Sequence, residues 1–292
     1  MGTGIFQLVF FRAKSRYDDE MAADVKFASG LFVSSGTGEP VVTFPSIDLI
    51  ATAGRERSIA CDDRTIHVWG FSLDGSDAAV ERCRAWLSGD ERARAARFVR
   101  QEDQRRYLLA HGGLRAVLSC YVGLEPGILT FHVGPTGKPA LADGSRSHNP
   151  LRFNLSHSHD RMLVAVAKDQ EVGADLEQIR DKVEAAKLAE RFYAPSERNR
   201  VASVTGLKQV HQFYRYWVAK EAVLKGQGVG LLSLPQCEIL ASDTASRAEV
   251  HLLTGETMQP GWTTHWLDCG PCWAGAVSAY GSNWIVRTMT RE

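Results

Sequence analysis

The sequence predicts an α+β fold made of two similar halves. Strand-like and helix-like segments follow the order strand, helices, strands up to about residue 170, and the same order then recurs. The chain has 292 residues, enough for one large domain or two of ordinary size. We therefore expect a first half at residues 63–170 and a second half at residues 171–292, with a ligand site where they meet.

The first half should begin with a strand at residues 65–71, whose residues alternate in polarity. A helix is expected at residues 77–87, with Asp77 as its cap, and a longer one at about 90–121, broken near 101–103. Short strands complete the half, at residues 129–133, 137–141, 151–155 and 162–167.

The second half should open with a strand at residues 171–177, which follows a turn at 168–170. Three helices come next, near residues 183–192, 195–202 and 209–226. Strands then return, at about residues 236–241, 248–253, 263–268, 273–280 and 284–288.

Residues 1–62 have no clear hydrophobic period, and the stretch 34–40 reads as a linker. We expect an N-terminal extension whose order the sequence does not reveal. Basic and acidic residues balance at 34 each, so no overall charge favours nucleic acid or a membrane as a partner. No apolar run approaches the ~18 residues of a spanning helix, and no secretion signal is evident. A cytoplasmic protein is expected.

The six cysteines are too few and too scattered for a disulfide framework in a chain of this length. Cys269-Gly270-Pro271-Cys272 matches the thioredoxin-type redox tetrapeptide. That chemistry needs the first cysteine at a helix N-terminus, whereas both flanks here read as strands. A hairpin turn is therefore favoured over a redox site.

Acidic residues of the second half occur at spacings that allow them to converge. Asp175 and Glu177 lie two apart on a predicted strand and so point to the same face. Glu221 and Lys225 lie one turn apart on a predicted helix. Two carboxylates about 4 Å apart repel each other by roughly 4 kcal/mol at an effective dielectric constant of about 20, so such a cluster needs a cation. Oxygen ligands of this kind suit Mg²⁺, which substrate phosphates usually help to bind.

Four further segments could carry chemistry. Lys138 lies on a tight turn, Gly137-Lys138-Pro139, and could meet a phosphate as a point charge. Asn154-Leu155-Ser156-His157-Ser158 ends a predicted strand, and we expect its hydroxyl and imidazole groups to be exposed together. Arginines line the helical stretch 92–106, and Phe192 to Glu197 form a helix stop followed by a new start with Pro195.

Together these segments resemble the 4′-phosphopantetheinyl transferases of the larger monomeric type, which serves peptide and polyketide synthases. Any one motif is weak, but five in family order at suitable spacing are a strong match over about residues 65–285. The motifs are Gly-Lys-Pro at 137–139, Asn-Leu-Ser-His-Ser at 154–158, Gly-x-Asp-x-Glu at 173–177, Phe-Tyr-x-x-x-Glu at 192–197 and Trp-x-x-Lys-Glu-x-x-x-Lys at 217–225.

The resemblance implies a fold of two α+β subdomains related by a pseudo-twofold, with coenzyme A in the cleft between them. It implies an enzyme, a holo-[acyl-carrier-protein] synthase or 4′-phosphopantetheinyl transferase. Such an enzyme moves the phosphopantetheine arm to a serine of an apo acyl or peptidyl carrier protein and releases adenosine 3′,5′-bisphosphate. Mg²⁺, or Mn²⁺ in its place, would be the cofactor, and a monomer is expected.

The resemblance also implies roles for single residues. Asp175, Glu177 and Glu221 match the metal positions, and Glu221, or a water held near it, is the candidate base. Asp175 and Lys225 would join Glu221 in catalysis, with Lys225 on the pyrophosphate. The positions that match nucleotide contacts are Lys138, Ser156, His157, Arg94, Arg106 and Lys225.

Glu91 and Ala174 depart from the family pattern. Glu91 and Arg94 stand where the family often has two lysines, so only Arg94 keeps the charge. Ala174 replaces a larger aliphatic residue, on the opposite strand face from Asp175.

Two other functions stay open at this point. A Mg²⁺-dependent phosphohydrolase would use the same acids and release product without a protein acceptor. A non-catalytic coenzyme A-binding protein would be expected to lack Asp175, Glu221 or Lys225, and all three are present.

Overall fold

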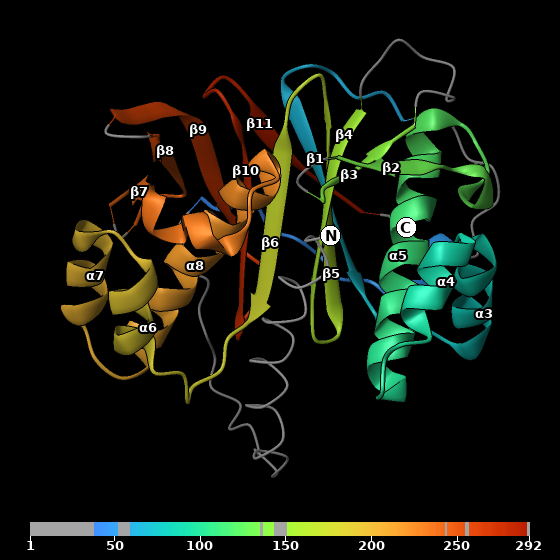
Figure 1. Ribbon diagram of the computed structural model, residues 1–292, viewed down its shortest axis with the longest axis horizontal. Coiled ribbons are helices and arrows are strands. Elements are labelled where there is room, and N and C mark those ends of the chain that lie inside the picture. The colour runs from blue at the N-terminus through green and yellow to red at the C-terminus, as the bar shows by residue number, and fades with distance from the viewer. Residues whose placement is uncertain are drawn as a thin grey trace.

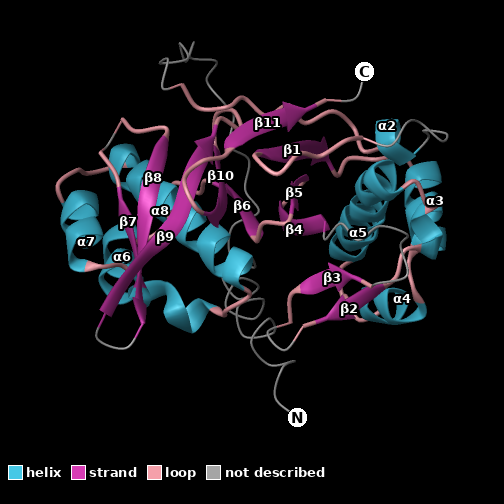
Figure 2. Ribbon diagram, turned by 90° about the horizontal axis from the view of Figure 1, so that it is seen from above, coloured by secondary structure: helices cyan, strands magenta, loops and turns pink. Residues whose placement is uncertain are grey.

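The computed structural model describes residues 38–51, 59–134, 137–142, 151–242, 244–254 and 257–290. Two sheets lie side by side between two groups of helices (Figures 1 and 2). The strand order is β11-β1-β5-β4 in the four-stranded sheet and β6-β10-β9-β8-β7 in the five-stranded sheet. A small third sheet joins β2 and β3. The predicted α+β class is confirmed.

The first half follows the predicted order closely. Its long helical stretch is interrupted at residues 96–100, slightly earlier than expected, because Arg100 is extended and α5 begins at the next residue. Its fourth strand runs on to Ser158, three residues past the predicted end. The elements are β1 (Thr65–Ser72), α3 (Asp77–Trp86), α4 (Gly89–Ala95), α5 (Gln101–Val122), the 3₁₀ helix η1 (Pro126–Ile128), β2 (Phe131–Val133), β3 (Pro139–Leu141), β4 (Leu151–Ser158) and β5 (Arg161–Lys168).

The elements of the second half follow the predicted order, but a 3₁₀ helix at residues 231–236 was not predicted, and the strand expected at 263–268 begins six residues earlier. The elements are β6 (Val172–Gln178), α6 (Ala185–Phe192), α7 (Pro195–Ala202), α8 (Leu207–Gln227), η2 (Leu231–Gln236), β7 (Cys237–Leu240), β8 (Arg247–Thr254), β9 (Thr257–Leu267), β10 (Trp273–Tyr280) and β11 (Ile285–Met289).

The two halves share one connectivity. In the first, β1 pairs antiparallel with β5, and β5 with β4, while helices connect β1 to the later strands. In the second, β6 pairs antiparallel with β10, and β10 with β9, again with helices after the first strand. The predicted similarity of the halves is therefore visible in the strand pairing.

Alternating strand residues build three apolar cores. One lies between the first sheet and α3 to α5, and another between the second sheet and α6 to α8. A third core lies where the two sheets face each other, and it contains Val68 of β1, Leu163 of β5 and Leu176 of β6. Ala174 lies in this third core, on the opposite face of β6 from Asp175, as predicted.

Part of the expected N-terminal extension belongs to the fold. The sequence left the order of residues 1–62 open, and the structure shows that residues 38–51 pack on the fold: Val42 and Ile47 are buried, and the helix α2 (Asp48–Ala51) packs on α5. Residues 1–37 and 52–58 lie outside the described residues.

The last strand also departs from the expected division of the chain. β11 was expected in the second half, but it pairs in parallel with β1 of the first sheet. Val286 of β11 packs against the core between the sheets, which accounts for its position. Among the described residues, no helix is long and apolar enough to cross a membrane.

The Cys-Gly-Pro-Cys tetrapeptide lies in the connection between the paired strands β9 and β10, as the hairpin interpretation predicts. Cys269 is buried, and burial raises the pKa of its thiol. Cys272 is exposed and has a positive φ of 63°. Because a redox motif of this kind needs an easily formed thiolate, the structure does not favour redox chemistry here.

Candidate active site

The site is built where β6 packs against α8. Gly173 of β6 faces the helix backbone so closely that a Cβ atom there would lie 1.9 Å from the carbonyl oxygen of Ala222. A glycine is therefore required at this point. The close contact places Asp175 and Glu177, on the same strand face as Gly173, towards the helix that carries Glu221 and Lys225.

Lys225 makes the central contacts of the site. Its ammonium group donates hydrogen bonds to Asp175 Oδ1 and, at 3.1 Å, to Ser156 Oγ. Asp175 is 2% exposed, and Glu221, one turn earlier on α8, is 8% exposed. The structure thus brings Asp175, Ser156 and Lys225 into direct contact from two halves of the chain.

Serine side chains of β4 hold the two acids of β6. Ser156 Oγ donates to Asp175 Oδ1 at 3.0 Å, and Ser158 Oγ donates to Glu177 Oε2 at 2.7 Å. Both serines are buried, so the expectation that this segment exposes its hydroxyl groups is wrong for them. They are buried because β4 ends against β6, with which it is in contact.

The surroundings of Lys225 have an excess of negative charge. Burial alone would lower the pKa of Lys225, but the charges of Asp175, Glu221 and Glu177 outweigh burial and raise it. Burial raises the pKa of Asp175, and the nearby charge of Glu177 adds to this effect. Lysine and aspartic acid therefore both hold a proton more tightly than in water, as expected where one cation faces three acids.

Two observations indicate that these residues are suited to bind a divalent cation. Asp175 Oδ2 is buried and has no hydrogen-bond partner, which is costly for a carboxylate oxygen. The surplus negative charge is the second observation. Among the described residues, however, no three His, Cys, Asp or Glu side chains already surround one point as in a complete metal site. Asp175 Oδ1 instead accepts a hydrogen bond from the Lys225 ammonium group.

Lys138 lies apart from the acids. Its ammonium group donates to Glu171 Oε2 at 2.7 Å, to the carbonyl of Gly226 at 2.7 Å and to that of Val172 at 3.0 Å. These contacts use all three of its protons and join the β2–β3 hairpin to the start of β6 and the end of α8. Lys138 also lines a pocket of about 220 Å³. Arg152, Phe153, Glu171, His132 and Gln227 are among the other lining residues.

The remaining predicted nucleotide contacts lie on other elements. His157 is exposed on β4, between Ser156 and Ser158. Arg106 forms ion pairs on its own helix with Asp103 at 3.7 Å and Glu102 at 4.0 Å. Arg94 is exposed, and its guanidinium lies 5.9 Å from the centre of the Tyr107 ring.

Lys220 and Glu197 form a buried ion pair beside the site. Lys220 is fully buried, and its ammonium lies 2.5 Å from Glu197 Oε2. Glu197 also accepts the backbone N–H groups of Ala194 and Ile239. The pair fixes α8 to the start of α7 and to β7. The two charges at these motif positions thus have a structural role, because they are buried against each other and do not lie on a solvated helix face.

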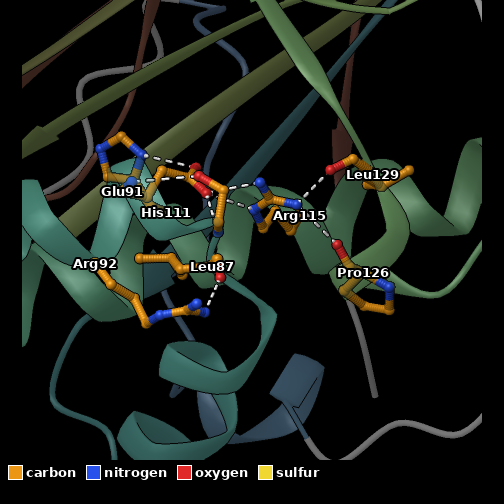
Figure 3. Close-up of polar contacts among 8 residues, drawn as sticks. Leu87, Glu91, Arg92, His111, Arg115, Pro126 and Leu129 are labelled. Carbon is orange, nitrogen blue, oxygen red and sulfur yellow. Dashed lines mark hydrogen bonds and ion pairs between the residues drawn. The ribbon is translucent and has the colours of Figure 1, made fainter.

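Glu91, which departs from the family pattern, has a structural role in the first half (Figure 3). It completes the capping box of α4 by accepting the N–H of Ser88. Its carboxylate also accepts two hydrogen bonds, at 2.6 and 3.1 Å, from Arg115, which is buried. Burial opposes ionisation, but contacts with His111, Arg115 and Ser88 lower the pKa of Glu91 to about 2. A lysine in this place would leave Arg115 without its carboxylate partner.

Sequence reasoning missed the serine at position 158 as a partner of an acid. The alternation Asn-x-Ser-x-Ser at 154–158 does show three polar residues on one strand face. Such a face beside a buried strand is a signal, but it does not reveal which strand will be its neighbour.

Two family models match this chain in succession. A model described as the 4′-phosphopantetheinyl transferase N-terminal region matches residues 74–170. A model described as the 4′-phosphopantetheinyl transferase superfamily matches residues 171–275.

Single relatives agree with the family models. The 4′-phosphopantetheinyl transferase HetI of Nostoc sp. is 38% identical over 179 residues, which are 61% of this chain and 75% of the relative. The 4′-phosphopantetheinyl transferase Sfp of Bacillus subtilis is 31% identical over 170 residues, 58% of this chain and 72% of the relative. A solved holo-(acyl-carrier-protein) synthase of Bacillus anthracis in complex with CoA is 21% identical, with a TM-score of 0.31, over 38% of this chain and 96% of that chain. The last likeness is too low to carry an argument. On the family models and the relatives, the chain belongs to the 4′-phosphopantetheinyl transferase superfamily.

Proposed function

We propose that this chain transfers the 4′-phosphopantetheine group from coenzyme A to a serine of an apo acyl or peptidyl carrier protein. The serine oxygen forms a bond to the phosphorus on the pantetheine side of the pyrophosphate. The bond from this phosphorus to adenosine 3′,5′-bisphosphate breaks, and the serine proton passes to a base. One observation carries the proposal: in a chain of this family, the Lys225 ammonium is hydrogen-bonded to Asp175, and the charges of Glu221 and Glu177 help to raise the pKa of the lysine.

Asp175, Glu177 and Glu221 would hold Mg²⁺, or Mn²⁺ in its place. The unpaired Asp175 Oδ2 and the surplus negative charge support this assignment. The bound ion would neutralise charge on the pyrophosphate and on the leaving bisphosphate.

Lys225 would stabilise the phosphoryl group that is transferred, because its ammonium already lies among the acids on a buried helix. Glu221, or a water beside it, would accept the proton of the carrier serine. Both residues belong to α8, whose position is fixed by the Lys220–Glu197 pair. The geometry of catalysis would thus depend on one helix.

The nucleotide would lie on the Lys138 side of the site. The pocket of about 220 Å³ beside Lys138 supports this position, since it opens between the two halves at the start of β6. Ser156 and His157 of β4, together with Arg94 and Arg106, would contact the nucleotide and its 3′-phosphate. The division near residue 170, a monomeric state and a cytoplasmic location are part of the same proposal.

The direct test is a panel of apo carrier proteins incubated with coenzyme A, Mg²⁺ and the purified chain, followed by intact-protein mass spectrometry. A gain of one phosphopantetheine group on a carrier is expected, with loss of the gain when EDTA is added. No gain on any carrier by the folded protein would refute the proposal. Hydrolysis of a phosphate ester without a protein acceptor would favour the phosphohydrolase instead.

Binding experiments should distinguish the role of the acids from the role of the residues that contact the nucleotide. Glu221→Gln is expected to abolish transfer and to change coenzyme A affinity less than Lys138→Ala does, because metal chemistry and anchoring use different residues. Calorimetric titration of coenzyme A into each variant measures the difference. Equal losses of transfer and of binding in both variants would contradict this division.

A further inference from the structure

The backbone of β6 donates hydrogen bonds to side chains of β4 along the edge where a neighbouring strand would normally pair. β4 and β6 are the edge strands of their sheets, and they lie next to each other. The backbone N–H groups of residues 174, 176 and 178 donate to side-chain oxygens of Asn154, Ser156 and Ser158, at 2.9, 3.2 and 3.4 Å. Alternate side chains of β4 thus take the place of a backbone ladder.

This arrangement fixes where each serine hydroxyl can donate. A hydroxyl group has one proton to donate and can accept two hydrogen bonds. Because the oxygens of Ser156 and Ser158 accept N–H groups from β6, their single protons are directed to the carboxylates of Asp175 and Glu177. Asn154, by contrast, accepts the N–H of Ala174 and lies against no acid in the contacts described.

We propose that Ser158 is a positioning residue of the active site, whose hydroxyl orients the Glu177 carboxylate for the metal ion. This inference rests on the proposed transferase function. Ser158 is 5% exposed and its oxygen lies 2.7 Å from Glu177 Oε2, so the contact is partly shielded from water. Groups that orient a metal-binding carboxylate in this way typically change metal affinity 10- to 100-fold when removed.

Ser158 is a better test of positioning than Ser156. Ser156 also accepts a hydrogen bond from Lys225, so its loss would disturb the cation and the acid together. Ser158 donates to Glu177 and accepts from the N–H of Gln178. Its removal therefore acts on Glu177 and on one bond of the ladder.

A variant elsewhere on β4 controls for the loss of the hydrogen bond from the Gln178 N–H to Ser158. Asn154→Ala removes one acceptor of the ladder, as Ser158→Ala does, but removes no partner of an acid. A second control is the Glu177→Gln background, in which the carboxylate that Ser158 orients is already neutral. Thermal unfolding in EDTA reports whether each variant is folded.

The experiment is a titration of Mn²⁺ into the full chain with saturating coenzyme A, in which electron paramagnetic resonance measures the free ion. Ser158→Ala should weaken Mn²⁺ binding about 10- to 100-fold. It should raise the Mg²⁺ concentration needed for half-maximal transfer, with kcat at saturating Mg²⁺ changed less than about threefold. Asn154→Ala should change the Mn²⁺ affinity less than about twofold, and Ser158→Ala should add little in the Glu177→Gln background.

Each alternative result overturns the assignment. Unchanged Mn²⁺ affinity in folded Ser158→Ala would exclude the positioning role, and an equal loss in Asn154→Ala would assign the effect to the ladder. An undiminished effect of Ser158→Ala in the Glu177→Gln background would show that Glu177 does not mediate it. The proposed function fails differently: wild-type protein would then bind Mn²⁺ and label no carrier.

Discussion

Lys225 provides the positive charge that the acids of the site require. Its ammonium donates to Asp175 Oδ1, and its raised pKa keeps it protonated at neutral pH. A lysine ammonium and a divalent cation are attracted by the same carboxylate oxygens. Lys225 therefore stabilises the folded acid cluster and, at the same time, competes for the oxygens that a metal ion would use.

This competition predicts that Lys225→Met abolishes transfer but strengthens Mg²⁺ binding in the absence of coenzyme A. The gain should be about tenfold, because the acids lose their internal cation and Asp175 Oδ1 becomes available. Isothermal titration calorimetry measures it, and Lys208→Met, at an exposed position of the same helix, is the control. Weaker or unchanged Mg²⁺ affinity in folded Lys225→Met would show that the lysine does not compete.

At this scale the sequence could predict the charged residues but not their partners. Asp175, Glu177, Glu221 and Lys225 follow from motif spacing, since a strand face and a helix face each have a fixed period. The contact of Ser158 with Glu177 could not be predicted, because it depends on two edge strands from different sheets meeting side by side. The burial of Lys220 likewise depends on its pairing with Glu197 of another helix.

Among the elements, α4 shows how a cap can depend on one buried charge. Glu91 caps the helix and also binds Arg115 of α5, which donates further to the carbonyl groups of Pro126 and Leu129 at 3.1 and 2.7 Å (Figure 3). The Arg115 guanidinium lies 4.9 Å from the centre of the Phe131 ring. One carboxylate therefore joins α4 to α5, and through Arg115 to the segment that leads into β2.

The lowered pKa of Glu91 predicts how stability depends on pH. The pKa of this carboxyl is about 2 in the folded chain, against an ordinary value of 4.5. Its contribution is thus present above about pH 4.5 and is lost as the pH falls towards 2, up to roughly 3 kcal/mol in all. Urea unfolding at pH 7 and pH 3 should show Glu91→Gln less stable at pH 7, with the difference from wild type shrinking at pH 3. An equal difference at both values would contradict the assignment, and Glu81→Gln at an exposed position is the control.

The bounds of most elements could be predicted because their signals are local. Caps, hydrophobic periods and turns place α6 to α8, β6 to β8 and β10 within a few residues, whereas β9 begins six residues before its predicted start. α2 was missed because its four residues are too few to show a helical period. β4 was predicted to end early because its last residues are polar, and their burial comes from β6.

The buried ion pair of Lys220 and Glu197 fixes α8, so the effects of mutating its two residues on stability should be strongly coupled. Lys220→Met should destabilise the chain by about 3–5 kcal/mol, because it leaves Glu197 buried without a cation. Adding Glu197→Gln should recover part of this loss, since the neutral amide still has an oxygen for one N–H group. A double-mutant cycle on free energies of unfolding measures the coupling. Additive losses would show that the pair does not act as a unit.

In the whole molecule, the N-terminal segment 38–47 runs across both halves. In the second half, Val42 N–H donates to the carbonyl of Asp268 at 2.9 Å, and Asp268 N–H to the carbonyl of Pro40 at 3.0 Å. In the first half, Ile47 N–H donates to the carbonyl of Ser72 at 3.0 Å. Together with β11 and the core between the sheets, this segment joins the halves into one body. The sequence could not predict this role, because a segment without a hydrophobic period takes its conformation from the residues on which it packs.

This joining predicts that the halves lose stability together. Ile47→Ala should lower the global free energy of unfolding by about 2–5 kcal/mol, because Ile47 is fully buried and packs closely against Gly75 and Gly113. Leu49→Ala, at a position 41% exposed, should cost much less. Native-state hydrogen exchange checks the prediction: amides of β5 in the first half and of β10 in the second should lose protection by the same free energy. A loss of protection confined to β5 and its neighbours would show instead that the halves unfold separately. Segment 38–47 would then stabilise the first half alone.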